Sequence, residues 1–157
     1  MPPTGPCRDA VTGLLNRDGL ELSLAALLEA GSAKRGIGAM LCVDLGGPDV
    51  LDAVARSCGP CAVDDLLRAA ADVLRQSVRG ADAIGRLGGD DFVIVLEGLG
   101  DLDNAARIGE TLLFALRRLS LHGAPALTPR IGVTRLPASG RAITSMFAAR
   151  ELALSGD

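Results

Sequence analysis

Aromatic side chains are almost missing from this sequence, which has no Trp, no Tyr and only three Phe. Proteins that bind single-stranded nucleic acid stack the bases on several aromatic rings, so the composition argues against a nucleic acid polymer as partner. The core must instead be built from Leu, Val, Ile and Ala. With 48% hydrophobic residues over 157 positions, the chain has enough of them for one domain with a single core.

Clustered positive charge is also lacking. Lys34 is the single lysine, the arginines are spread along the chain, and the formal net charge is -3. This pattern argues against a DNA-binding stripe and a polybasic membrane segment. Apolar runs such as residues 39–43 have only the length of a strand, so no membrane insertion by this segment is predicted. The N-terminus lacks the basic and apolar regions of a secretory signal, so we expect a cytoplasmic location.

A disulfide scaffold is not expected without such a signal, although the chain has four cysteines. Cys58-Gly59-Pro60-Cys61 matches the thioredoxin redox tetrapeptide, but it follows helical sequence rather than a strand, and no Trp precedes it. We interpret it as a turn, with a thiol redox role as the alternative. His122, the single histidine, is expected to be a solvated loop residue.

Apolar periodicity predicts alternating helices and strands after a loose lead-in at residues 1–8. The predicted helices are 17–31, 49–57, 62–79, 103–119 and 142–154, and the predicted strands are 37–44, 83–87, 92–96 and 127–134. Two glycines between the second and third strands allow a tight hairpin. The interleaved order predicts an α/β fold of the α+β sandwich type, in which helices flank a mixed central sheet with a GGDDF hairpin.

Three aspartates are predicted to meet at one edge of this sheet. Asp44 ends the first strand, and Asp90 and Asp91 lie at the tip of the hairpin. Mg²⁺ is often held by one or two carboxylates together with substrate phosphates, and paired ions stabilise both oxygens of a phosphoryl transfer. The alternative interpretation is that Asp90 and Asp91 are ordinary turn residues, since Asp is common in turns.

The segments around these aspartates resemble the motifs of the GGDEF family of diguanylate cyclases. Residues 86–92, Arg-Leu-Gly-Gly-Asp-Asp-Phe, are similar to the family's signature. Three further segments resemble its other motifs in the same order: 9–17 (D-x-L-T-G-L-x-N-R), 43–45 (I-D-L-D) and 130–133 (S-I-G-V). The resemblance implies one GGDEF domain over residues 9–157 with a nucleotide-cyclase, palm-like fold. The family's C-terminal A-K-x-x-G-R-N motif is absent, so we expect the domain to lack the family's last strand.

The family joins two GTP molecules into cyclic di-GMP between two facing domains, so the resemblance implies a homodimer if the protein is catalytic. Asp44 and Asp91 would bind Mg²⁺ or Mn²⁺, and Asp90 would be a metal ligand or the base for the 3′-hydroxyl. Gly88 and Gly89 would let the nucleotide approach the hairpin backbone. Asp91 departs from the family's usual Glu and is one methylene shorter.

The substrate-binding positions after Asp44 depart further from the family's D-x-D-x-F-K-x-x-N-D. An ungapped alignment puts Pro48 in place of Phe, Asp49 in place of Lys, and Asp52 in place of the Asn that reads guanine. Pro48 has no N–H to offer a triphosphate, and an added carboxylate repels one. The family's second guanine contact is best matched by Asp64.

Arg79 and Asp82 match the family's product-binding inhibitory motif, R-x-x-D, at the expected spacing before Gly88. An arginine fork binds the O6/N7 edge of guanine or a phosphate, and a carboxylate accepts from guanine N–H groups. Arg107 is the candidate for a third contact from the following helix. The alternative is an ordinary arginine at a helix end that pairs with a nearby aspartate.

The sequence therefore predicts a GGDEF domain of cyclic di-GMP signalling that binds cyclic di-GMP at Arg79 and Asp82 and has weak or no cyclase activity. The alternative is an active diguanylate cyclase that takes GTP with Mg²⁺ or Mn²⁺ and is inhibited by its product. Binding is preferred over catalysis because the substrate-binding positions depart from the family's motif, whereas Arg79 and Asp82 match the R-x-x-D motif.

Overall fold

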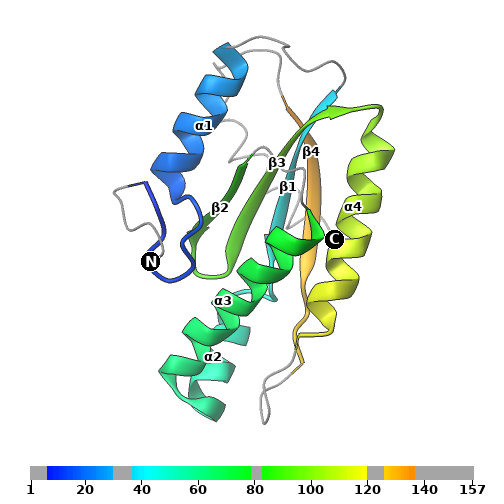
Figure 1. Cartoon of the computed structure of the whole chain (residues 1–157). Coiled ribbons are helices and arrows are strands. Elements are labelled where there is room, and N and C mark those ends of the chain that lie inside the picture. Colours follow the sequence, from blue (N-terminus) through cyan, green and yellow to red (C-terminus); the bar gives the residue numbers. More distant parts are fainter. Residues whose placement is uncertain (1–6, 30–36, 79–82, 120–125, 137–157) are drawn as a thin grey trace.

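Four strands form one sheet at the centre of the computed structural model, which describes residues 7–29, 37–78, 83–119 and 126–136. The strands are β1 (Ile37–Asp44), β2 (Ala83–Gly88), β3 (Asp91–Leu99) and β4 (Arg130–Arg135). The helices are α1 (Arg17–Glu29), α2 (Pro48–Cys58), α3 (Pro60–Ser77) and α4 (Leu102–Arg117) (Figure 1). The helix predicted at 142–154 lies outside the described residues.

The strand order across the sheet is β2-β3-β1-β4, and all three neighbouring pairs are antiparallel. The α+β fold with its hairpin and covering helices is confirmed, whereas the mixed strand directions expected from the sequence are not seen in this sheet. The hairpin is the reason: α2 and α3 return the chain so that β2 runs parallel to β1, and the tight turn then inserts β3 between them. Among the described residues, the one parallel pairing is the isolated bridge between Leu15 and Gly85.

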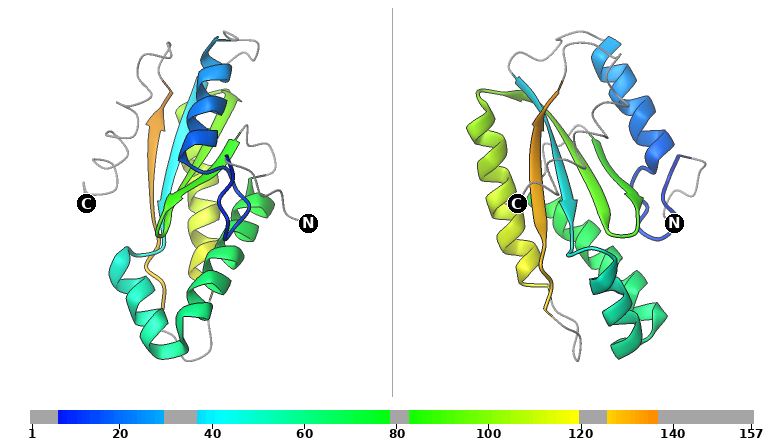
Figure 2. Two further views of the ribbon diagram at one scale, coloured as in Figure 1. Left: turned by 90° about the vertical axis from the view of Figure 1, so that its left-hand side faces the viewer. Right: turned by 180° about the vertical axis from the view of Figure 1, so that it is seen from behind.

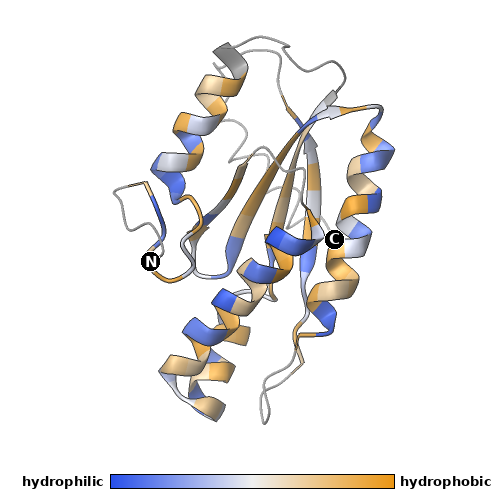
Figure 3. Cartoon of the chain, in the orientation of Figure 1, coloured by the Kyte–Doolittle hydropathy of each residue, from blue (hydrophilic) through white to orange (hydrophobic). Residues whose placement is uncertain are grey.

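β1 is buried on both of its faces, which explains its uninterrupted apolar run. Its alternate side chains enter two separate hydrophobic clusters: Ala39, Leu41 and Val43 enter one, and Met40 and Cys42 enter the other. Residues of α3 and α4 complete the first cluster, and Leu20 and Leu24 of α1 contribute to the second. Figure 1 shows α3 in front of the sheet, and Figure 2 shows the strands in front of α3 when seen from behind. The hydrophobic colouring follows the central strands in Figure 3.

Helix boundaries follow the signals in the sequence. Pro48 is the first residue of α2, where its missing N–H costs nothing. Gly59, with a φ of 92°, separates α2 from α3, so the Cys58–Cys61 segment is a turn between two helices, as expected. Asp101 caps α4, and its Oδ1 accepts a hydrogen bond from the Asn104 N–H at 3.0 Å. In the part of the chain that the structure describes, no helix combines the length and apolarity needed to cross a membrane.

The segment before α1 is tied to β2 through Asp9 and Leu15. The Leu15 N–H donates to the Ile84 carbonyl at 3.2 Å, and the Leu15 carbonyl accepts from the Arg86 N–H at 2.8 Å. Asp9 Oδ2 accepts from the N–H and Oγ1 of Thr12, at 2.9 and 2.7 Å, and its Oδ1 accepts from Arg86 Nη1 at 2.8 Å. These hydrogen bonds therefore hold the N-terminal motif against the hairpin.

Because Asp9 takes part in these contacts, the free energy of unfolding depends on pH. Burial raises the pKa of Asp9, but hydrogen bonds from Thr12 and the charge of Arg86 outweigh it and lower the pKa below its ordinary value of 3.8. A carboxyl whose folded-state pKa is depressed stabilises the native state above its unfolded-state pKa, and this contribution is lost as the pH falls toward the folded-state value. We expect wild-type unfolding free energy to fall more steeply below about pH 4 than that of Asp9→Asn.

Urea denaturation at a series of pH values from 6 to 2 measures this difference. Glu110→Gln, which neutralises an exposed carboxylate in the middle of α4, is the control for the loss of one negative charge. Equal slopes for wild type and Asp9→Asn would contradict the assignment.

Candidate functional site

The three predicted aspartates lie at the same end of the sheet. Asp44 is the last residue of β1, Asp90 is in the turn between β2 and β3, and Asp91 begins β3. Because β1 pairs with β3 in a register that puts Val43 opposite Phe92, the end of β1 lies beside the hairpin tip. Figure 1 shows this end of the sheet meeting the start of α2.

Asp90 is buried and is bound to the loop that follows β1. Its Oδ2 accepts hydrogen bonds from the N–H groups of Leu45 at 2.9 Å and Gly47 at 2.7 Å. Only 5% of the residue is exposed. Two backbone amides on one buried carboxylate oxygen fix the loop against the hairpin, so Asp90 has a clear structural role.

Asp44 is also buried, and its carboxylate is engaged by an arginine of the neighbouring strand. Arg130 Nε donates to Asp44 Oδ1 at 3.3 Å, and Arg130 Nη2 donates to Oδ2 at 3.0 Å. The Gly46 N–H donates to Oδ1 as well, at 2.9 Å. The Asp44 side chain is 4% exposed and that of Arg130 is 46% exposed, so the guanidinium covers the carboxylate from the solvent side.

The hairpin tip has the two glycines with positive φ that the tight turn was predicted to use. Gly88 and Gly89 have φ values of 136° and 47°, which favour glycine, and both are exposed. Side chains added at either position would meet no atom within 4 Å, so there is free space above this turn. Arg86 Nε donates to the Gly89 carbonyl at 2.9 Å and helps to hold the tip.

A divalent cation does not fit the carboxylates in this arrangement. Mg²⁺ demands oxygen ligands in near-ideal geometry, but both oxygens of Asp44 receive hydrogen bonds from Arg130, and one oxygen of Asp90 receives two from the loop. No group of three or more His, Cys, Asp or Glu residues is placed to hold a metal within the described ranges. Gly46 stands where the I-D-L-D motif has its second Asp, and a Cβ there would lie 2.5 Å from Thr128 Oγ1.

The predicted guanine-binding residues lie on adjacent helices. Asp52 is exposed on α2 and Asp64 is half-buried on α3, and these two helices pack against each other. Pro48 and Asp49 are both exposed in the first turn of α2. The helix start that could bind a triphosphate therefore carries a residue with no N–H and an added negative charge.

The predicted cyclic di-GMP site is only partly described. Arg79 and Asp82 lie outside the described residues. Arg107 is exposed on α4, and its Nη1 donates to Asn104 Oδ1 at 3.4 Å. Arg107 is thus held on its own helix by a long hydrogen bond.

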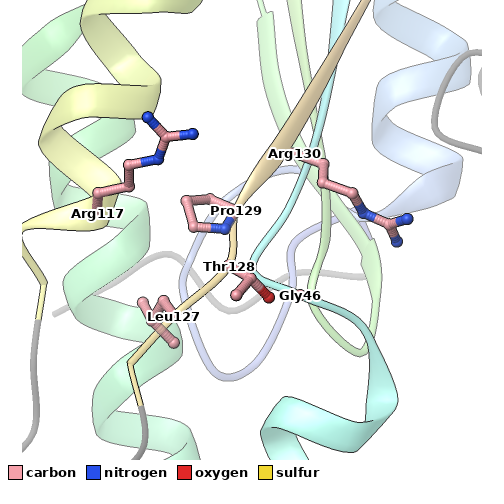
Figure 4. Close-up of a pocket in the computed structure, with 6 residues that line it drawn as sticks. All are labelled: Gly46, Arg117, Leu127, Thr128, Pro129 and Arg130. Atoms are coloured by element: carbon pink, nitrogen blue, oxygen red, sulfur yellow. The ribbon is translucent and has the colours of Figure 1, made fainter. Parts of the chain in front are cut away.

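Arg130 is the site residue that the sequence prediction overlooked. Arg130 stands where the S-I-G-V motif begins with Ser, and this change from Ser to a long cation is the signal that the sequence holds. Arg130 also lines a cavity of about 610 Å³ with Gly46, Arg117, Leu127, Thr128 and Pro129. Figure 4 shows Arg117 and Arg130 extending to opposite sides of the chain segment between them.

The two cysteines of the tetrapeptide are both exposed. Cys58 ends α2 and Cys61 lies in the first turn of α3, with no disulfide between them. A Cβ at Gly59 would meet no atom within 4 Å, so glycine is needed there for its positive φ alone. The geometry supports the turn interpretation.

The sheet order, the central hairpin and the covering helices define an α+β domain of the nucleotide-cyclase, palm-like class. The chain belongs to the GGDEF family, because the family described as diguanylate cyclase, GGDEF domain, matches residues 7–155. It is therefore a GGDEF domain of cyclic di-GMP signalling, in a family whose cyclase catalysis depends on metal.

Curated relatives are much longer than this chain. An uncharacterized signaling protein of Caulobacter vibrioides is 31% identical over 154 residues, which cover 93% of this chain and 18% of the relative. Diguanylate cyclase DgcS of Shewanella oneidensis is 34% identical over 91 residues, covering 57% of this chain and 29% of DgcS. This chain thus matches less than a third of the length of either protein.

Solved structures agree with the fold. A sensory box/GGDEF family protein from Caulobacter crescentus has a TM-score of 0.80 at 32% identity, covering 94% of this chain and 95% of that one. Diguanylate cyclase SiaD from Pseudomonas aeruginosa, in complex with its activator SiaC, has a TM-score of 0.80 at 25% identity. The match covers 95% of this chain and 56% of the SiaD chain.

The buried hydrogen bonds of Asp90 predict a large structural effect. Asp90→Ala leaves the N–H groups of Leu45 and Gly47 without their acceptor, and we expect a loss of about 2–4 kcal/mol in unfolding free energy. Asp90→Asn, which keeps an acceptor oxygen, should lose less. Urea denaturation at pH 7 measures both.

Glu110→Ala, on the exposed face of α4, is the control and should stay within about 0.5 kcal/mol of wild type. If Asp90→Ala is as stable as this control, Asp90 does not hold the loop.

Proposed function

We propose that this GGDEF domain binds cyclic di-GMP through Arg79 and Asp82 and has weak or no cyclase activity. The observation that carries the weak-cyclase part of the proposal is the engagement of Asp44 by Arg130, which removes a carboxylate that GTP-bound metal would need. The cytoplasm remains the predicted compartment.

The residues at the substrate-binding positions of α2 also support weak cyclase activity, independently of the contact between Asp44 and Arg130. The first turn of α2 presents Pro48 and the side chain of Asp49, where a triphosphate needs N–H groups and positive charge. Asp52, exposed on the same helix, is an acceptor only, so it lacks the amide donor of the family's Asn. GTP therefore loses contacts at both its phosphates and its base.

The binding part of the proposal is supported by the chemistry of the R-x-x-D pair. A guanidinium donates two parallel hydrogen bonds to guanine O6 and N7, and a carboxylate accepts from N1–H and N2–H₂, so the pair selects guanine over adenine. One solved structure with this fold, the coiled coil and GGDEF domain of DgcB from Caulobacter crescentus, was determined in complex with c-di-GMP. At 18% identity that structure shares the fold alone with this chain.

Calorimetry with cyclic di-GMP tests the binding site. Wild-type protein should bind, and Arg79→Ala should bind at least about tenfold more weakly, because a charge-assisted hydrogen bond contributes roughly 1.5–3 kcal/mol. Arg68→Ala, which removes an exposed arginine that pairs with Asp65 on α3, is the matched control and should bind as wild type does. Absence of wild-type binding, or unchanged binding by Arg79→Ala, refutes the site.

Cyclase activity is tested on nucleotide-free protein with GTP and Mg²⁺ or Mn²⁺. We expect little or no cyclic di-GMP from the wild type and from Arg79→Ala, as measured by chromatography. Arg79→Ala distinguishes the alternative, because an enzyme limited by its product gains activity when the inhibitory site is removed. Multiple turnovers by either protein, confirmed as a dimer by sedimentation, would establish an active cyclase instead.

A further inference from the structure

Arg130 is held against Asp44 by the pairing of two strands. Asp44 and Arg130 are direct cross-strand partners at the end of the β1–β4 ladder. The guanidinium contacts both carboxylate oxygens, at 3.3 Å from Nε and 3.0 Å from Nη2. This two-pronged contact is built into the sheet register, which distinguishes it from a mobile surface ion pair.

The buried carboxylate of Asp44 needs a positive partner. Its side chain is 4% exposed, and an unpaired charge at such depth is costly. In the metal-dependent family that partner is expected to be a divalent metal ion. Here the guanidinium of Arg130 contacts both carboxylate oxygens instead. A divalent ion at these oxygens would have to displace the guanidinium, because Arg130 already contacts both of them and the two positive charges repel each other.

We infer that Arg130 replaces the divalent cation at Asp44, so that this corner of the domain is neutralised without a metal. The family's strand motif begins with Ser at this position, and a serine side chain is uncharged and too short to reach across as the arginine does. The metal site is therefore latent, and removal of the Arg130 guanidinium exposes Asp44 to a cation. This inference deepens the weak-cyclase part of the proposed function and does not depend on cyclic di-GMP binding.

Direct titration with Mn²⁺, followed by the electron paramagnetic resonance signal of the free ion, tests the inference without any activity measurement. Wild-type protein should bind Mn²⁺ only weakly, and Arg130→Ser should bind at least about tenfold more tightly, because a positive charge next to Asp44 is gone. Arg117→Ser is the matched control. Arg117 lines the same cavity but extends away from Arg130, so its loss should leave Mn²⁺ affinity unchanged (Figure 4).

A double variant identifies the ligand. Arg130→Ser combined with Asp44→Asn removes the carboxylate but keeps an acceptor for the Gly46 N–H, and the gain in Mn²⁺ affinity should disappear. Arg130→Ser should also have a lower melting temperature than wild type in EDTA, and Mn²⁺ should raise it, because Asp44 then has a cationic partner again. If Arg130→Ser does not fold, Arg130→Gln keeps a hydrogen-bond donor without the charge and should show the same gain.

Equal Mn²⁺ affinity of wild type and the Arg130 variants overturns the inference, and so does a gain that survives Asp44→Asn. Cyclic di-GMP calorimetry on Arg130→Ser separates this result from the proposed function. If Arg130→Ser binds cyclic di-GMP as wild type does but shows no gain in Mn²⁺ affinity, only the cation replacement is rejected. If the wild type does not bind cyclic di-GMP, only the R-x-x-D site is rejected.

Discussion

The pairing of β1 with its two neighbours is the constraint on which the candidate site depends. β1 is hydrogen-bonded to β3 on one side and β4 on the other, and it is buried on both faces. The register that puts Val43 opposite Phe92 also puts Asp44 opposite Arg130. A slip of one residue would exchange the two buried faces of the strand, so the core specifies this register strongly.

Burial then determines the electrostatics of this corner. Asp44 and Asp90 are 3% and 5% exposed, and charges at that depth require partners. Asp90 obtains them from loop amides, and Asp44 from a loop amide and a guanidinium. All these donors belong to the chain itself. Asp44 and Asp90, two of the three carboxylates that the family resemblance assigned to metal, therefore hold the β1–α2 loop and the end of β4 in place.

The substrate corner and the hydrophobic core are separate parts of this fold. The hairpin tip keeps its exposed glycines, and α2 and α3 still pack against each other. The residues that depart from the family's motifs here are Pro48, Asp49, Asp52 and Arg130, and the last three of these change the charge of the corner. None of these four residues belongs to the two hydrophobic clusters on either side of the sheet.

Local signals accounted for most of the elements. The continuous apolar run of β1, the proline at the start of α2 and the paired glycines of the hairpin each act through the backbone of a few neighbouring residues. Local signals were weaker where the end of a strand was decided by its pairing with a neighbouring strand. β4 begins at Arg130 rather than at Leu127, since Pro129 has no N–H for the ladder. The strand directions were mispredicted because the insertion of β3 between β1 and β2 is a long-range event.

By itself, the sequence determined the family, the order of the elements and the chemical identity of the three aspartates, because motifs and periodicity are properties of neighbouring residues. Only the tertiary structure decided what those aspartates contact. Arg130 is 86 residues from Asp44 along the chain, and Asp90 is 45 from Leu45, so no local pattern joins them. The sheet brings these groups together, and burial then requires each carboxylate to take the donor beside it.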